Sequence, residues 1–136
     1  MQINPYLSFN GQCETAFKFY EKVLGGKIAF TMTWGESPMA KEMPPELHNR
    51  IMHTKLIIGD AALMGADAPP KYYQKPEGLS ISLSYKDVKE GERVFNALAD
   101  GGTVKMAFQK TFWALGFGMC IDKFGIPWMV NCEEGA

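Results

Sequence analysis

The feature that most constrains the fold of this chain is an internal repeat. A shift of 76 residues superimposes similar residues: Leu7 on Leu83, Ser8 on Ser84, Glu14 on Glu90, Phe19 on Phe95 and Gly25-Gly26 on Gly101-Gly102. Six of the twenty positions from 7 to 26 are then identical, whereas ordinary residue usage gives about one by chance. A repeat of this length predicts that one supersecondary unit occurs twice.

Each copy predicts the order strand, helix, strand, strand, strand. Alternating apolar and polar residues predict first strands over 4–9 and 80–85, and apolar residues at helical spacing follow both. Period-two patterns predict the other strands, over 27–34, 52–58, 61–65, 104–108, 116–122 and 126–132. We therefore expect an α+β fold of two tandem βαβββ units, whose curled mixed sheet surrounds a cavity.

The ends of the helices and the segments between units also carry signals. Asp87, with Glu90 three residues on, predicts a capping box, and Gly-Gly after each helix suits a left-handed C-cap. Prolines predict a long mobile loop over Glu36–Arg50. We expect one domain over residues 1–136, with a first unit over about 1–66, a linker over about 67–78 and a second unit over about 79–136.

Composition narrows the class of protein. The chain is 46% hydrophobic and 21% charged with a formal net charge of −1, which predicts a folded protein without the basic surface that nucleic acids require. Uncharged stretches such as Thr111–Ile121 are too short to cross a membrane. The first residues do not resemble a signal peptide, and the three cysteines lack paired spacing. We expect a cytoplasmic protein with reduced thiols and no membrane or nucleic-acid partner.

Several motifs, in order, resemble those of the vicinal-oxygen-chelate (glyoxalase/bleomycin resistance/dioxygenase) superfamily. The helix end Phe19–Gly26 is similar to its FY-x-x-V-L-G-G motif. Four further segments resemble the PhnB-like branch: Pro5–Gly11, His53–Gly59, Leu63–Asp67 and Asp122–Trp128. The resemblance covers nearly the whole chain and implies the paired βαβββ fold.

For metal-using members, the resemblance implies four inward ligands, at the first and last strands of each unit. Residue by residue, these positions fall on Asn4 (or Pro5), Ser80, Met64 and Met129. Hard divalent ions prefer imidazole and carboxylate ligands, so we expect no metal and no cofactor. A loop site from His48, His53, Glu42 and Glu46 is an alternative, but we favour a solvated loop and the start of a strand for the two histidines.

The branch is sometimes labelled a demethylubiquinone methyltransferase. A nucleotide methyl donor favours a Gly-rich turn between a strand and a helix, whereas both Gly-Gly pairs follow helices. We therefore set the label aside. Three functions stay open: a small-molecule-binding protein without metal, a metal-independent enzyme moving protons with Glu or His of the long loop, and a lyase, isomerase or dioxygenase using a non-standard or absent metal site.

We favour small-molecule binding, and the sequence does not decide whether a reaction is catalysed. If the sheets curl together as in the family, the polar strand faces line one cavity, made by Asn4, Tyr6, Ser8, Met64, Ser80, Ser82, Ser84, Met129 and Asn131. Trp34 and Phe112-Trp113 either close over a ligand or pack in a core or dimer. The uncharged segment Phe112–Phe117 favours a homodimer.

Overall fold

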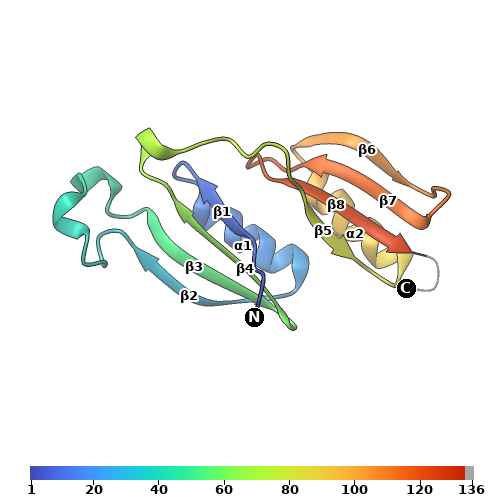
Figure 1. Cartoon of the computed structure of the whole chain (residues 1–136), viewed down its shortest axis with the longest axis horizontal. Coiled ribbons are helices and arrows are strands. Elements are labelled where there is room, and N and C mark those ends of the chain that lie inside the picture. Colours follow the sequence, from blue (N-terminus) through green and yellow to red (C-terminus); the bar gives the residue numbers. More distant parts are fainter. Residues whose placement is uncertain (134–136) are drawn as a thin grey trace. The chain divides into compact units, whose positions relative to one another are not determined.

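The computed structural model describes residues 1–133 and divides the chain into two compact units, Met1–Gln74 and the part that begins at Lys75 (Figure 1). Each unit contains one α-helix and one mixed four-stranded sheet. No helix within residues 1–133 is long and apolar enough to cross a membrane. The expected fold class, two βαβββ units, is confirmed.

The first unit has the sheet order β1-β4-β3-β2. Its elements are β1 (Tyr6–Phe9), α1 (Cys13–Leu24), β2 (Lys27–Thr33), β3 (Ile51–Ile58) and β4 (Ala61–Asp67). β1 runs parallel to β4, and the other neighbours are antiparallel. Short 3₁₀ turns follow β2 and β4, at η1 (Ala40–Glu42), η2 (Pro45–Leu47) and η3 (Pro70–Tyr72).

The second unit repeats this topology with the sheet order β5-β8-β7-β6. Its elements are β5 (Ile81–Ser84), α2 (Val88–Ala99), β6 (Thr103–Gln109), β7 (Ala114–Ile121) and β8 (Pro127–Glu133). β5 is the parallel edge strand beside β8. All eight strands lie where the sequence pattern predicts them, with ends that differ by one or two residues.

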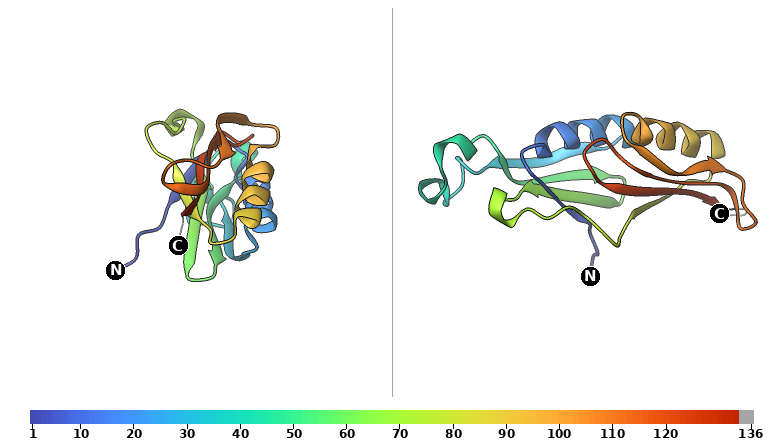
Figure 2. Two further views of the ribbon diagram at one scale, coloured as in Figure 1. Left: turned by 90° about the vertical axis from the view of Figure 1, so that its right-hand side faces the viewer. Right: turned by 90° about the horizontal axis from the view of Figure 1, so that it is seen from above.

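In each unit the helix covers one face of its own sheet and leaves the other face open (Figure 2). Under α1, the ring of Phe17 packs edge-on against Phe9 and Tyr20, with centroids 6.1 and 5.7 Å away. A Cβ atom on Gly65 would lie 2.6 Å from that ring, so the close approach of α1 to β4 requires glycine there. Under α2, the buried residues Phe95 and Trp128 fill the same layer.

The repeat shifts by one residue at the helices. α1 and α2 begin 75 residues apart, whereas β2 and β6 begin 76 apart, because three residues rather than two follow α2. Buried Tyr20 therefore corresponds to buried Phe95, and the sequence alignment of Phe19 with Phe95 is wrong. Phe19 is half-buried, and Phe17 takes the core position.

The extra residue also changes the end of the second helix. Gly25 caps α1 in the left-handed conformation, with φ of 77°. At α2 the C-cap is Asp100 in an extended conformation, and the left-handed residue is Gly101 just after it. At the other end, Asp87 caps α2 by accepting a hydrogen bond from the Lys89 amide, while the Glu90 carboxylate bonds to Arg93.

The expected mobile loop after β2 is held by its own hydrogen bonds. His48 Nε2 lies 2.9 Å from the Ala40 carbonyl oxygen and 3.0 Å from that of Met43. The Ser37 hydroxyl donates to the Trp34 carbonyl, and the Gly35 amide donates to the His48 carbonyl. These bonds give the loop a fixed shape without a regular helix or strand.

Candidate functional site

The open face of the first sheet carries both aromatic and polar side chains. Tyr6 and Ser8 are exposed on β1, opposite to buried Leu7 and Phe9. Residues that face each other on neighbouring strands share one side of a sheet. The register therefore places one row across all four strands: Tyr6, Met64, Lys55 and Phe30.

His53 lies on this same face and pairs with Tyr6. The Tyr6 hydroxyl is 3.0 Å from His53 Nδ1, and the two rings stack with centroids 5.6 Å apart. Burial, and to a smaller extent the nearby Cys13, raises the pKa of the Tyr6 phenol, which keeps it protonated at neutral pH. The sequence pattern predicts His53 at the start of a strand but does not predict this contact. The alternation of His53 and Lys55 with buried Thr54 and Leu56 is the signal that indicates its face.

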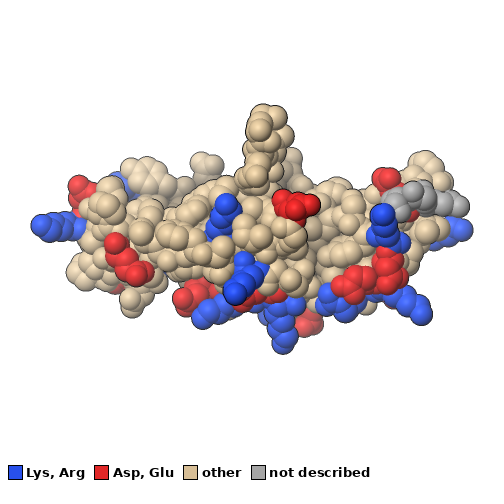
Figure 3. Space-filling model, turned by 90° about the horizontal axis from the view of Figure 1, so that it is seen from below, with Lys and Arg blue, Asp and Glu red and all other residues tan. Residues whose placement is uncertain are grey.

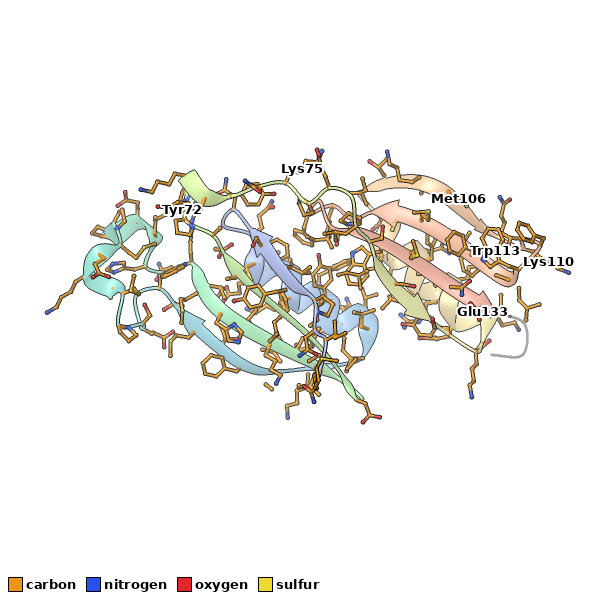
Figure 4. All side chains as sticks on the ribbon, in the orientation of Figure 1. Tyr72, Lys75, Met106, Lys110, Trp113 and Glu133 are labelled. Atoms are coloured by element: carbon orange, nitrogen blue, oxygen red, sulfur yellow. The ribbon has the colours of Figure 1, made fainter. Side chains whose placement is uncertain are left out.

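Thioethers dominate the open face of the second sheet. The register gives one row of Ser82, Met129, Met119 and Met106, and a second row of Ser84, Asn131, Phe117 and Gln109. Figure 4 labels Met106 on β6 and Trp113. The ring of Trp113 packs against Phe117 with centroids 5.3 Å apart.

On this face, Asn131 has a buried side-chain oxygen without a hydrogen-bond partner. Its Nδ2 donates a hydrogen bond to Glu133. Its Oδ1 is buried and is the only such side-chain oxygen or nitrogen without a partner in the described part of the chain. An unpaired buried acceptor costs free energy, so a ligand N–H or O–H group is one way to satisfy this atom.

The nine predicted site residues fall into two groups. Tyr6, Ser8 and Met64 lie together in the first unit, and Asn4 comes just before β1. Ser82, Ser84, Met129 and Asn131 lie together in the second unit, and Ser80 comes just before β5. That the two groups line one cavity stays a prediction.

Comparison with known proteins gives the family. Residues 1–131 match the family described as 3-demethylubiquinone-9 3-methyltransferase. The chain belongs to this family. It is 37% identical to Protein YjdN of Escherichia coli (strain K12), over 96% of this chain and 95% of that protein. It is also 48% identical to the crystal structure of protein PA1353 from Pseudomonas aeruginosa, with a TM-score of 0.90 and 98% of each chain covered.

More distant structures share the fold. A PhnB protein from Bacillus cereus, titled a putative 3-demethylubiquinone-9 3-methyltransferase, has a TM-score of 0.82 at 21% identity, over 97% of this chain and 99% of that one. A glyoxalase/bleomycin resistance protein/dioxygenase family enzyme from Burkholderia phytofirmans has a TM-score of 0.65 at 11% identity, over 96% and 97%. The family match confirms the resemblance to the PhnB-like family, and these distant neighbours share the glyoxalase/bleomycin resistance fold.

The four positions at which the resemblance implies metal ligands do not fit a hard divalent ion in this chain. Met64 and Met129 offer thioethers, and Ser80 offers a hydroxyl. His48 Nε2 faces two carbonyl oxygens, so that nitrogen carries a proton and presents no lone pair. No three His, Cys, Asp or Glu side chains converge within residues 1–133. The absence of a metal itself stays a prediction.

The family description names a methyltransferase, which raises the question of a nucleotide site. The Cys13 amide, the first donor of α1, is already taken, because Asp67 Oδ1 accepts from it (3.0 Å) and from the Gly11 amide just before the helix (2.8 Å). A phosphate at a helix N-terminus needs such amides free. The sheet of this unit has a single parallel pair, β1 with β4, unlike the parallel sheets that bind dinucleotides.

The three cysteines are buried and free. Burial is the first cause that raises the pKa of each thiol, to about 11 for Cys120. For Cys13 the nearby Asp67 carboxylate adds to the effect. These thiols therefore stay protonated at neutral pH, and the thiolate is the reactive form of cysteine. A nucleophilic cysteine does not fit this site.

Proposed function

We propose that this protein binds a small, partly polar, uncharged or weakly charged organic molecule without a metal. The binding residues in this proposal are Asn4, Tyr6, Ser8, Met64, Ser80, Ser82, Ser84, Met129 and Asn131. The observation that carries it is the composition of the open faces. Both present apolar or aromatic rows beside a few hydroxyl and amide groups, which is the usual lining of a ligand site.

The chemistry of the faces narrows the ligand. Thioethers are polarizable and make favourable contacts with aromatic rings, and three of them form the row on the second sheet. The unpaired Asn131 Oδ1 favours a ligand with one N–H or O–H donor. We therefore expect flat organic molecules with a donor group at one edge to bind more tightly than anions or aliphatic sugars.

A thermal-shift screen of an organic library, on protein stripped of metal by chelation, tests the proposal. A ligand raises the melting temperature by mass action. Met129→Trp and Ser82→Leu should each abolish the shift, with little loss of stability, because Ser82 is exposed and Met129 is half-buried. Thr15→Leu, on the exposed side of α1, is the control and should leave the shift intact. Unchanged binding by both face variants would overturn the proposal.

The metal part of the proposal has its own measurement. Elemental analysis of the purified protein should find no stoichiometric divalent metal, and a chelator should leave the melting temperature unchanged. About one zinc, nickel or iron per chain, together with a lower melting temperature after chelation, would show that the four ligand positions were transferred incorrectly.

A second candidate function, a proton-transfer enzyme, is favoured by the Tyr6–His53 pair. In the tautomer whose Nδ1–H donates to the Tyr6 oxygen, His53 Nε2 can accept a proton from a bound carbon or oxygen acid and return it, while the Tyr6 hydroxyl donates a hydrogen bond to the ligand. For any ligand found in the screen, NMR in D₂O would measure exchange of its acidic proton. His53→Gln and Tyr6→Phe should slow the exchange at least tenfold yet retain binding. Exchange at the rate of free ligand with the unchanged protein would exclude catalysis.

The proposal also includes a cytoplasmic homodimer. Three buried reduced thiols suit a reducing compartment. Phe112 is 97% exposed beside exposed Trp113 and Leu115, and an apolar patch of this kind is typical of a subunit interface. Light scattering at micromolar concentration should give a mass of twice 15.2 kDa, and Phe112→Asp should reduce this mass to that of a single chain. A monomer in the unchanged protein would rule out the dimer.

A further inference from the structure

A groove lies inside the first unit, away from the strand faces described above. It has a volume of about 740 Å³, which is within the range of small-molecule sites. Its walls come from the loop between β2 and β3 and from the segment after β4. We call it the loop groove. Tyr72, labelled in Figure 4, belongs to the second wall.

The walls of the loop groove are largely apolar and fixed in place. Pro44, Pro69 and Pro70 line it, and proline restricts the backbone. The floor residue Trp34 donates a hydrogen bond from Nε1 to the Asp67 carbonyl oxygen, at 3.0 Å. Together with the bonds made by His48, this contact holds the groove walls in a fixed position. A preformed site loses little free energy to ordering when it binds.

Aromatic and thioether groups are exposed at the rim. Tyr72 is 67% exposed and Met39 is 48% exposed, although folding normally favours burial of such surface. The ammonium group of Lys71 lies 5.1 Å from the centre of the Tyr72 ring. This contact shows that the ring face is accessible to a cation, since the electron-rich face of an aromatic ring attracts positive charge.

The charge of the loop groove has a definite sign. Glu42 and Glu46 both line it, and neither side chain forms an ion pair or hydrogen bond with any residue between 1 and 133. Lys71 is the single basic lining residue. On the face in Figure 3, acidic and basic side chains are otherwise interleaved, without a large area of one sign. Two unpaired carboxylates beside an apolar aromatic wall are complementary to an organic cation.

We propose that the loop groove is a second binding site, which takes an organic cation with an aromatic or alkyl body. The body lies against Trp34, the prolines and the methionines, and the ammonium group lies between the Tyr72 ring and the two carboxylates. This site is independent of the ligand site on the open sheet faces, and either one can be wrong without the other.

Three naphthalene probes of one shape test the charge requirement: 1-naphthylmethylammonium, 1-naphthalenemethanol and 1-naphthalenesulfonate. Calorimetric titration should show the cation binding at least tenfold more tightly than the alcohol, with no binding of the sulfonate. The double variant Glu42→Gln, Glu46→Gln should weaken cation binding about tenfold, since each exposed charge contributes modestly. It should leave binding of the alcohol unchanged. Equal affinity for the three probes would overturn the proposal.

Two further variants define the mechanism. Lys71→Gln should tighten cation binding severalfold, because it removes a competing positive charge from the Tyr72 ring. Glu14→Gln, on the exposed side of α1, changes net charge by the same amount as one groove variant and should have no effect. A loss of affinity with Glu14→Gln equal to that with Glu42→Gln would mean that net charge alone attracts the probe.

The position of the probe can be read directly by NMR. In protein labelled at the methionine methyl groups, the cation should shift the signals of Met39 and Met43, which line the loop groove. The signals of Met106, Met119 and Met129, on the second sheet, should not move. Met129→Trp should leave cation binding intact. Shifts confined to the methionines of the second sheet would place the cation in the other site and overturn the inference.

Discussion

The two units have the same strand order and helices of equal length, yet they differ on their open faces and in their loops. The first unit carries the Tyr6–His53 pair and joins β2 to β3 through the long loop over 34–50. The second carries a row of thioethers and joins β6 to β7 through residues 110–113 alone. The topology depends on the hydrophobic pattern that both copies keep. The Tyr6–His53 pair, the long loop and the thioether row each occur in one copy only.

One buried aspartate in each unit shows the same divergence. Asp67 accepts hydrogen bonds from the amides of Gly11, Cys13 and Ile51, which belong to distant parts of the chain. Asp122 accepts from the amides of Phe124 and Ile126 and from the Trp128 indole, all within six residues. The first carboxylate joins separate segments, and the second shapes a hairpin turn.

The largest effect should come from replacing these two carboxylates. Asp67→Asn replaces an acceptor oxygen with an NH₂ donor group that faces three backbone amides. Asp122→Asn makes the same replacement among donors that all lie within six residues. Because bonds to charged groups contribute about 1.5–3 kcal/mol each, we expect a loss of about 3–5 kcal/mol for Asp67→Asn and a smaller loss for Asp122→Asn, whose donors stay close along the chain. Urea unfolding measures both. Equal losses would show that the long-range hydrogen bonds of Asp67 stabilise the protein no more than the local ones of Asp122.

A second test asks whether the helices pack alike in the two units. A Cβ atom at Gly65 would lie 2.6 Å from the Phe17 ring, and one at Gly118 would lie 2.7 Å from the Phe95 ring. Gly65→Ala and Gly118→Ala should therefore each cost about 1–3 kcal/mol through overpacking. Gly59→Ala, where a Cβ meets nothing but φ is positive, separates strain from crowding. A large loss of stability from only one of the two variants would show that the helices do not pack equally closely on their sheets.

A smaller difference is expected at the starts of the helices. Asp87 caps α2 with its own side chain, whereas Gln12 makes no such bond at α1. Asp87→Ala should lower the free energy of unfolding by about 1 kcal/mol, and Gln12→Ala should leave it within experimental error. Thermal or urea unfolding checks both variants. A similar loss for Gln12→Ala would mean that the Gln12 side chain stabilises the start of α1 in addition to the Asp67 carboxylate, which accepts from the Cys13 amide.

At neutral pH the smallest effect should be that of the buried thiols, which change the stability only when the pH becomes alkaline. Burial raises the pKa of Cys120 from 9.0 to about 11 and raises that of Cys13 further. A raised thiol pKa contributes stability fully below pH 9, and this is lost as pH rises toward the folded value. Cys120→Ala should therefore flatten the fall in unfolding free energy between pH 8 and pH 10.5, and Cys13→Ala should do the same in the other unit. Parallel pH profiles for variant and unchanged protein would contradict this.

The sequence by itself determined the repeated topology, because hydrophobic periodicity depends on local geometry alone. Alternation along 80–85 and apolar spacing after Asp87 specify a strand and a helix wherever they occur. The same kind of alternation indicates that Leu7 and Phe9 share one side of β1, which is the buried side. Alternation along β8 likewise puts Trp128 on the buried side, where it is 1% exposed.

Only the tertiary structure decided which distant residues meet. The Tyr6–His53 contact spans 47 residues, and nothing near either residue in the sequence indicates the other. The same is true of Asp67 at the start of α1 and of the two segments that form the loop groove. The shift of the helices by one residue was also hidden, because identical glycine pairs concealed an extra residue after α2. Such contacts depend on strand register and loop path, which arise when the whole unit packs.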